Sequence, residues 1–281
     1  MGTLIQYCTE ASKFDGQFAW QAAGMGYIIL TRHGHIIAID GGGCREDAEG
    51  MISLMERAAG ERPRVVLWII THPHNDHYTA LLKIAEDPEL QKRLEIDTVM
   101  SCIPESFTWM RRGELCNAQK DIDRVSSLAG KLGCSSKRAA AGERIDIDGT
   151  VIEILHTYEN AATVADPNEL SIVFTVSGDT KRIMFTGDAY PAGLEVVYRA
   201  YRERPEELKC DILQAAHHGL NGGHTLFYKL VDADTVLVPI SRSGDRAMNL
   251  PEENVAHHNL YAERRAATVI KAFCGTAAIE I

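Results

Sequence analysis

Three histidines and one aspartate fall within six residues in the segment Thr71 to His77, which reads THPHNDH. Neighbouring imidazoles repel one another when they are protonated, and they contribute little to packing. Neutral imidazoles and carboxylates are good ligands for zinc and other first-row transition metals. We therefore predict a metal site here, rather than a solvated polar loop in which Asp76 only caps a helix.

The spacing within this segment indicates two metal positions. His72 and His74 follow the apolar run Val65–Ile70 on extended backbone, where side chains two residues apart point to the same side. Asp76 and His77 open the helix that is expected next, so they can turn toward a second point nearby. One loop can thus supply ligands to two ions a few ångströms apart.

Two later segments also place ligand-type residues directly after an apolar strand. Asp188 follows Arg182–Gly187, and His217 and His218 follow Asp211–Ala216. Ligands in open α/β sheets bind beyond the carboxyl ends of strands. Each segment alone is typical of a turn or a surface histidine pair, but together with the first loop they predict one shared site.

The elements that must position these residues are many short strands with helices between them. This pattern predicts two packed sheets with helices outside, and the lack of any linker-like segment predicts one domain over residues 1–281. The expected strands are Tyr27–Thr31, His35–Asp40, Val65–Ile70, Ile96–Cys102, Arg144–Ile147, Val151–His156, Leu170–Val176, Lys181–Thr186, Asp211–Ala215, Thr235–Pro239 and Ala277–Ile281. The expected helices are Glu46–Ala59, Asp76 to about Leu94 with an interruption near Pro88, Glu114–Leu132, Gly193–Arg202, Thr225–Leu230 and Asn259–Lys271.

Composition narrows the class of protein. The net charge of −10 disfavours a dedicated binder of extended nucleic acid, because such binders usually carry a basic face. The seven cysteines are scattered and never spaced as CxxC, which indicates free thiols in a reducing compartment. No apolar run approaches the roughly 20 residues of a membrane helix, and residues 1–17 show neither the basic start nor the apolar stretch typical of a signal peptide. We expect a soluble cytoplasmic protein with no membrane partner.

The motifs resemble those of the metallo-β-lactamase superfamily. The resemblance implies an α/β fold, a four-layer αββα sandwich of two mixed β-sheets flanked by helices, with one or two metal ions at one edge. The late HHG motif is most similar to the metallo-β-lactamase-like domain of bacterial competence DNA-uptake proteins and to phosphorylcholine esterases. The matching segments are the HxHxDH loop His72–His77, Ile39-Asp40-Gly41-Gly42, Phe185-Thr186-Gly187-Asp188 and His217-His218-Gly219.

The resemblance also implies a ligand set. His72 and His74 would hold one ion, Asp76 and His77 the other, and Asp188 would lie between them. His217 would complete the second position, with His218 either sharing that role or contacting substrate. The predicted catalytic residues are accordingly Asp76, Asp188 and His218.

Relatives of this superfamily usually place another histidine ligand between the loop and Asp188. His156 is the only histidine of this chain between His77 and His217. It could supply the ligand or be structural, with Asn168, Glu169 or water as replacements. Asp40 is expected to orient a ligand imidazole through its free N–H.

Function follows from this chemistry. Two divalent ions, zinc first with manganese or iron as alternatives, can generate hydroxide at neutral pH. The prediction is a hydrolase that uses a metal-bound hydroxide. The resemblance to the branch with the late HHG motif implies a phosphodiester or related ester, of small-molecule or nucleotide type, as the substrate. The alternatives are a regulatory metal-binding module with an incomplete ligand set and an iron-dependent redox enzyme. Possible phosphate contacts are Arg45, Ser241 and Arg242.

Overall fold

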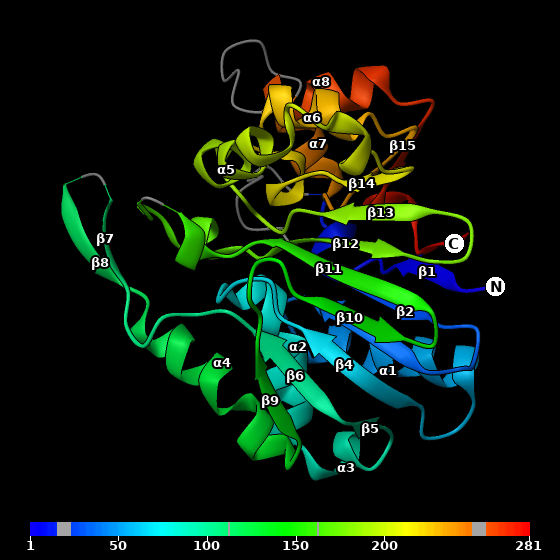
Figure 1. Cartoon of the computed structure of the whole chain (residues 1–281). Helices are drawn as coiled ribbons and strands as arrows, with labels where there is room; N and C mark the ends of the chain where they lie inside the picture. The colour runs from blue at the N-terminus through cyan, green and yellow to red at the C-terminus, as the bar shows by residue number, and fades with distance from the viewer. Residues whose placement is uncertain (16–23, 112, 162, 249–256) are drawn as a thin grey trace.

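The structure is a computed structural model that describes residues 1–15, 24–111, 113–161, 163–248 and 257–281. Its elements form two large mixed sheets that pack face to face between layers of helices (Figure 1). Within the described residues, no helix has the length and apolar character needed to cross a membrane.

The first large sheet has the order β17-β1-β2-β3-β4-β6-β9, and β5 pairs with β4 beside this path. Strands β17 to β3 run antiparallel, whereas β3, β4, β6 and β9 run parallel. The N-terminal and C-terminal strands are therefore neighbours in one sheet. The bounds are β1 Thr3–Gln6, β2 Gly26–Leu30, β3 Ile36–Asp40, β4 Arg64–Ile69, β5 Glu95–Ile96, β6 Thr98–Ser101, β9 Ser135–Arg138 and β17 Ala277–Glu280.

The second large sheet has the order β10-β11-β12-β13-β14-β15-β16. Its first four strands are antiparallel, and β13 to β16 are parallel. The bounds are β10 Arg144–Ile147, β11 Thr150–His156, β12 Val173–Ser177, β13 Arg182–Phe185, β14 Ile212–Gln214, β15 Thr235–Val238 and β16 Thr268–Lys271.

The helices lie on the two outer faces of this sandwich (Figure 1). In the first half of the chain they are α1 Arg45–Ala59, α2 Asn75–Glu86, α3 Pro88–Gln91 and α4 Gln119–Leu132. In the second half they are α5 Pro191–Tyr201, α6 Thr225–Val231, α7 Arg242–Met248 and α8 His257–Arg265.

Three apolar layers hold the four structural layers together. One cluster joins α1, α2 and α4 to the first sheet, a second fills the space between the sheets, and a third joins the second sheet to α5, α6 and α8. Residues 65–69 of β4 are all apolar because both faces of the strand are covered: Trp68 faces the helices, while Leu67 and Ile69 face the other sheet. The predicted αββα sandwich is confirmed.

Two predicted helices are wrong in part. Residues 114–117 do not begin a helix; they form β8 (Glu114–Asn117), which pairs with β7 (Thr108–Arg111) in a two-stranded hairpin before α4. Residues 268–271 leave the predicted C-terminal helix and become β16, which pairs in parallel with β15. In both cases strand pairing outweighs a local helical pattern, since backbone hydrogen bonds to a partner strand stabilise the extended form.

The topology brings the polar strand ends to one edge. Strands β3 and β4 are parallel in the first sheet, and β13, β14 and β15 are parallel in the second. Strand β3 ends at Asp40, and β4 is followed by Ile70 and Thr71. Strands β13, β14 and β15 are followed directly by Thr186, Ala215 and Pro239. The candidate ligands follow these ends.

Candidate metal centre

The loop between β4 and α2, together with the first turn of α2, carries four of the candidate ligands. His74 is the N-cap of α2, so Asp76 and His77 lie in the first turn of that helix. His72 and His77 are fully buried. The Nε2 atom of His72 lies 3.0 Å from Nδ1 of His74, and Nε2 of His77 lies 3.8 Å from Oδ2 of Asp76. The loop thus presents two adjacent pairs of ligand atoms.

Asp188 lies between these pairs. It follows β13 and Gly187, whose φ of 52° is left-handed; an added Cβ there would lie 3.1 Å from Cβ of Thr71. Only glycine fits this turn without strain. The Oδ2 atom of Asp188 lies 3.3 Å from Nε2 of His77 and 3.7 Å from Nε2 of His72. Ser171 Oγ accepts a hydrogen bond of 3.0 Å from the Asp188 backbone N–H.

His217 and His218, which follow β14, have different neighbours. Nε2 of His218 lies 3.0 Å from Oδ2 of Asp76, 3.3 Å from Nε2 of His77 and 3.4 Å from Oδ2 of Asp188. Nε2 of His217 comes within 3.9 Å of Oδ2 of Asp188. The structure therefore groups His218, rather than His217, with Asp76 and His77.

Backbone strain accompanies this arrangement. Asp40, His217 and His218 all have positive φ, at 51°, 49° and 54°. A non-glycine residue in the left-handed region costs on the order of 1 kcal/mol or more, and such residues cluster at functional sites. Consecutive left-handed residues turn the His217 and His218 side chains toward different parts of the site.

Buried acceptors set the orientation of the imidazoles. Asp40 Oδ2 lies 2.8 Å from Nδ1 of His77, and the Pro239 carbonyl lies 3.0 Å from Nδ1 of His218. A carboxylate and a carbonyl oxygen both accept hydrogen bonds, so each imidazole can donate from Nδ1, which leaves Nε2 directed at the centre. The Thr71 hydroxyl, which donates to Asp40, lies 3.2 Å from Nδ1 of His72. This is the usual support for metal-binding histidines.

The electrostatics of the cluster call for a cation. Burial alone would lower the pKa of His77, but the Asp188 and Asp40 carboxylates raise it well above its usual value. Burial alone would also lower the pKa of His218, but the Asp188 and Asp76 carboxylates together raise it to about 10. Burial would raise the pKa of Asp188, but His77 and His218 hold it well below its usual range. The carboxylates of this cluster therefore favour a positive charge among the side chains of His77, Asp188 and His218.

The donors present fit divalent metal ions. Two groups have one ligand atom per residue within 4.8 Å of one another: His72, His77 and Asp188, and Asp76, His77 and His218. Asp188 Oδ1 and His217 Nδ1 are buried without a hydrogen-bond partner among the described residues. Buried polar atoms normally have partners. Imidazoles and carboxylates packed in this way are typical ligands of zinc and related metals.

His156 joins neither of these groups. It ends β11 and is buried, and both of its ring nitrogens lack a hydrogen-bond partner in the described part of the chain. A Cβ added at Gly193, in α5, would lie 3.2 Å from its Nε2. Burial lowers the pKa of His156 to about 4. Its ring packs under α5 as a neutral imidazole, and the structure does not bring it to the other candidate ligands.

A cavity of about 440 Å³ opens onto the cluster. Asn168, one of the predicted replacements for the middle histidine, lines it with an unpartnered Oδ1, whereas Glu169 does not. The lining residues also include several that the sequence did not single out, because no motif marks them. These are Trp109, Arg111, Asp166, Pro167, Tyr190, Leu220 and Asn221.

The predicted phosphate contacts lie elsewhere. Arg45 forms ion pairs with Asp87 and Glu49, and Arg242 stacks on the ring of Phe273. Ser241 is buried and accepts a hydrogen bond from the backbone of Gly244. None of the three lines the cavity above the histidines.

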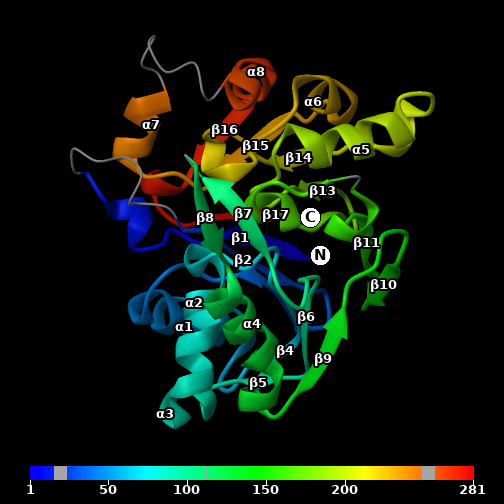
Figure 2. The ribbon, with the colours of Figure 1, turned by 90° about the vertical axis from the view of Figure 1, so that its left-hand side faces the viewer.

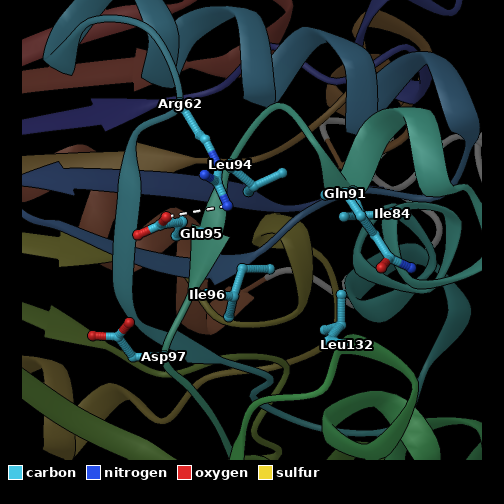
Figure 3. Close-up of a pocket in the computed structure, with 8 residues that line it drawn as sticks. All are labelled: Arg62, Ile84, Gln91, Leu94, Glu95, Ile96, Asp97 and Leu132. Carbon is cyan, nitrogen blue, oxygen red and sulfur yellow. Dashed lines mark ion pairs between the residues drawn. The ribbon is translucent and has the colours of Figure 1, made fainter.

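A second cavity, of about 360 Å³, lies away from the ligands (Figure 3). Arg62, which precedes β4, forms an ion pair of 3.1 Å with Glu95 there, and Asp97 is nearby. The ligand loop follows the opposite end of β4. This cavity has no imidazole in its described lining.

Comparison with known proteins identifies the fold. The family model described as Metallo-beta-lactamase superfamily matches residues 25–238. No curated protein matches the chain.

Solved structures of the same fold share little sequence with the chain. The metallo-beta-lactamase fold protein YhfI from Bacillus subtilis superposes with a TM-score of 0.56 at 12% identity, covering 99% of this chain and 100% of that one. A diphosphatase from the PhnP family gives 0.53 at 12% identity, covering 100% and 98%. CmlA, a diiron beta-hydroxylase from Streptomyces venezuelae, gives 0.54 at 11% identity, covering 99% of this chain and 54% of CmlA.

Proposed function

Because the chain belongs to the metallo-beta-lactamase superfamily, we propose that it is a metal-dependent hydrolase that acts on a phosphodiester or a related ester. The observation that carries the proposal is the position of Asp188, whose Oδ2 lies within 3.9 Å of ring nitrogens from four histidines. The likeness to the competence-protein branch remains a prediction.

The contacts and the resemblance together support one ligand assignment. His72, His74 and Asp188 would hold the first ion, with the Asn168 amide oxygen as a further donor. Asp76, His77 and His218 would hold the second, to which Asp188 would also contribute. We propose zinc as the native metal, with manganese or iron as alternatives. When bound, divalent ions lower the pKa of water and accept charge that builds on substrate oxygen.

The protein's own groups prepare the site for this chemistry. Asp40 and the Pro239 carbonyl hold the imidazoles in one tautomer, so that their Nε2 atoms stay available. His217 lies at the cavity, where its ring can contact the substrate. Tyr190 and Asn221 also line the cavity and can hydrogen bond to ester oxygens.

The choice of a phosphate ester rests on two supports. One structural neighbour is a diphosphatase, and the late HHG motif resembles that of phosphorylcholine esterases. The net charge of −10 favours a small-molecule or nucleotide-type substrate over extended nucleic acid.

Hydrolysis of bis-p-nitrophenyl phosphate tests the proposal. The chelator-stripped protein should be inactive, and zinc, manganese or iron should restore activity. Asp188→Asn should lower kcat at least 100-fold, since it removes a shared ligand charge. Asp97→Asn, in the cavity of Figure 3, is the matched control and should leave activity unchanged. If the protein does not hydrolyse bis-p-nitrophenyl phosphate with any of the three metals, the proposal is wrong.

Two alternatives have specific support. A regulatory metal-binding module is favoured by the isolation of His156, which leaves the first position short of a histidine; it predicts tight metal binding without turnover. An iron-dependent redox enzyme is favoured by the fold of CmlA. It predicts bound iron after anaerobic purification, together with thiol-dependent oxygen uptake.

A further inference from the structure

One wall of the metal cavity comes from the β7–β8 hairpin. Trp109 and Arg111, both in β7, line the cavity together with the candidate ligands His74 and Asp76. Figures 1 and 2 show this hairpin rising from the end of α4 to the level of the second sheet. The hairpin is a separate two-stranded sheet that belongs to neither large sheet.

The register of the hairpin explains which side chains face the cavity. Residues two apart on a strand share a face, so Trp109 and Arg111 lie on one face of β7. Met110 pairs with Leu115 across the strands on the other face, where they are 62% and 73% exposed. The indole and the guanidinium therefore point toward the site while the aliphatic pair points away.

Contacts at its base hold the hairpin in place. The Ala118 N–H donates to the Phe107 carbonyl at 3.0 Å, and the rings of Phe107 and Trp109 stack with centroids 5.9 Å apart. Both rings pack against the apolar cluster that lies between the first sheet and helices α1, α2 and α4. Tyr78 of α2 donates a 2.6 Å hydrogen bond to Asp121 of α4. The helix that carries Asp76 and His77 is thus tied to the helix that carries the hairpin.

The charge pattern singles out Arg111. The described lining of the cavity contains the carboxylates Asp76, Asp166 and Asp188, and Arg111 is its only lysine or arginine. No ion pair or hydrogen bond to the Arg111 guanidinium occurs among the described residues, whereas Arg45 and Arg62 are both paired with carboxylates. An unpaired guanidinium at a cavity wall is suited to bidentate binding of phosphate or carboxylate.

This inference rests on the function proposed above. We propose that Arg111 determines specificity by binding a second anionic group of the substrate. Trp109 stacks on the part of the substrate that joins this group to the ester. The substrate class is a phosphate ester with a further phosphate beyond the ester that is cleaved. The ester itself lies against the histidines and Asp188, which come from the sheet edges, whereas Arg111 comes from the hairpin. A cavity of about 440 Å³ is in the range of small-molecule sites and holds far more than one phosphate group.

Equilibrium binding tests this independently of turnover. Calorimetry on the zinc-loaded protein compares thymidine 3′,5′-bisphosphate with thymidine 5′-monophosphate, which differ by one phosphate. We expect the bisphosphate to bind about tenfold more tightly, the size of one charge-assisted contact. Arg111→Gln should reduce that ratio to about one, and Arg111→Lys should keep part of it.

Arg62→Gln is the matched control, because it removes an arginine from the distant cavity (Figure 3) and should leave the ratio at its wild-type value. A wild-type ratio near one, or a full ratio in Arg111→Gln, overturns the assignment of Arg111. Failure of the hydrolase proposal shows separately, as absence of bis-p-nitrophenyl phosphate hydrolysis while the binding ratio is still measurable.

Discussion

The Asp40 carboxylate lies 2.8 Å from Nδ1 of His77, and both side chains are completely buried. The same carboxylate accepts hydrogen bonds of 2.8 Å from the backbone N–H and the hydroxyl of Thr71. Asp40 therefore fixes the start of the ligand loop and one imidazole of that loop at the same time. This relationship links the end of β3 to the candidate metal centre.

Asp40→Asn should weaken metal binding about 10- to 100-fold, the usual cost of removing a carboxylate that supports a ligand histidine. Competition with a chromophoric chelator measures the affinity. Asp148→Asn is a matched control, because Asp148 Oδ2 lies 2.7 Å from Nδ1 of His35 outside the candidate centre. Equal losses of affinity in the two variants would contradict the role given to Asp40.

His218 and His217 should differ in their effect on metal content. His218→Ala should lower the metal bound per chain, since His218 Nε2 lies 3.0 Å from Asp76 Oδ2 and 3.3 Å from His77 Nε2. His217→Ala should keep the metal and alter turnover. Elemental analysis of both variants after gel filtration decides between them, and loss of an ion from the His217 variant would refute the grouping.

His156→Leu should leave the metal content unchanged. The imidazole is buried, neither ring nitrogen has a partner among the described residues, and burial lowers its pKa to about 4. Replacing a buried, unpaired polar group with an apolar one of similar size is expected to stabilise the fold by about 1 kcal/mol. Urea unfolding gives the stability, and loss of one metal ion would show that His156 is a ligand after all.

Asp148 should give the fold a pH-dependent increment of stability. A 2.6 Å hydrogen bond from the Thr31 hydroxyl, aided by His35, lowers the pKa of Asp148 in the folded protein. A carboxyl group with a lowered folded pKa stabilises the protein above its unfolded pKa of about 3.9, and this stabilisation is lost as the pH falls through the folded pKa. The gain is at most about 1 kcal/mol, because the pair is near the surface.

Urea unfolding of chelator-treated wild type and Asp148→Asn, from pH 7 to pH 3, measures this increment. The wild type should be the more stable protein at pH 6, and the difference should shrink below about pH 4. A difference that grows on acidification would show that the contact acts with the opposite sign.

Much of the candidate centre could be predicted because four of its ligands lie within one short segment, residues 72–77. The types and spacing of His72, His74, Asp76 and His77 already indicate metal-ligand chemistry. The strand-end positions of Asp188 and of the pair His217 and His218 predict that they share the site, without separating the two histidines. The alternation of apolar strands with amphipathic helices also predicts the sandwich. Each of these signals depends on residues within one element or one turn.

Which side chains converge was decided by tertiary structure. His217 and His218 are neighbours with the same chemistry, and only the left-handed turn and the Pro239 carbonyl turn His218 toward Asp76. His156 ends a strand as a ligand would, but packing against Gly193 keeps it apart. Arg111 belongs to no motif and reaches the cavity through cross-strand pairing in β7–β8. Residue type is encoded locally, whereas side-chain direction depends on packing between segments far apart in the chain.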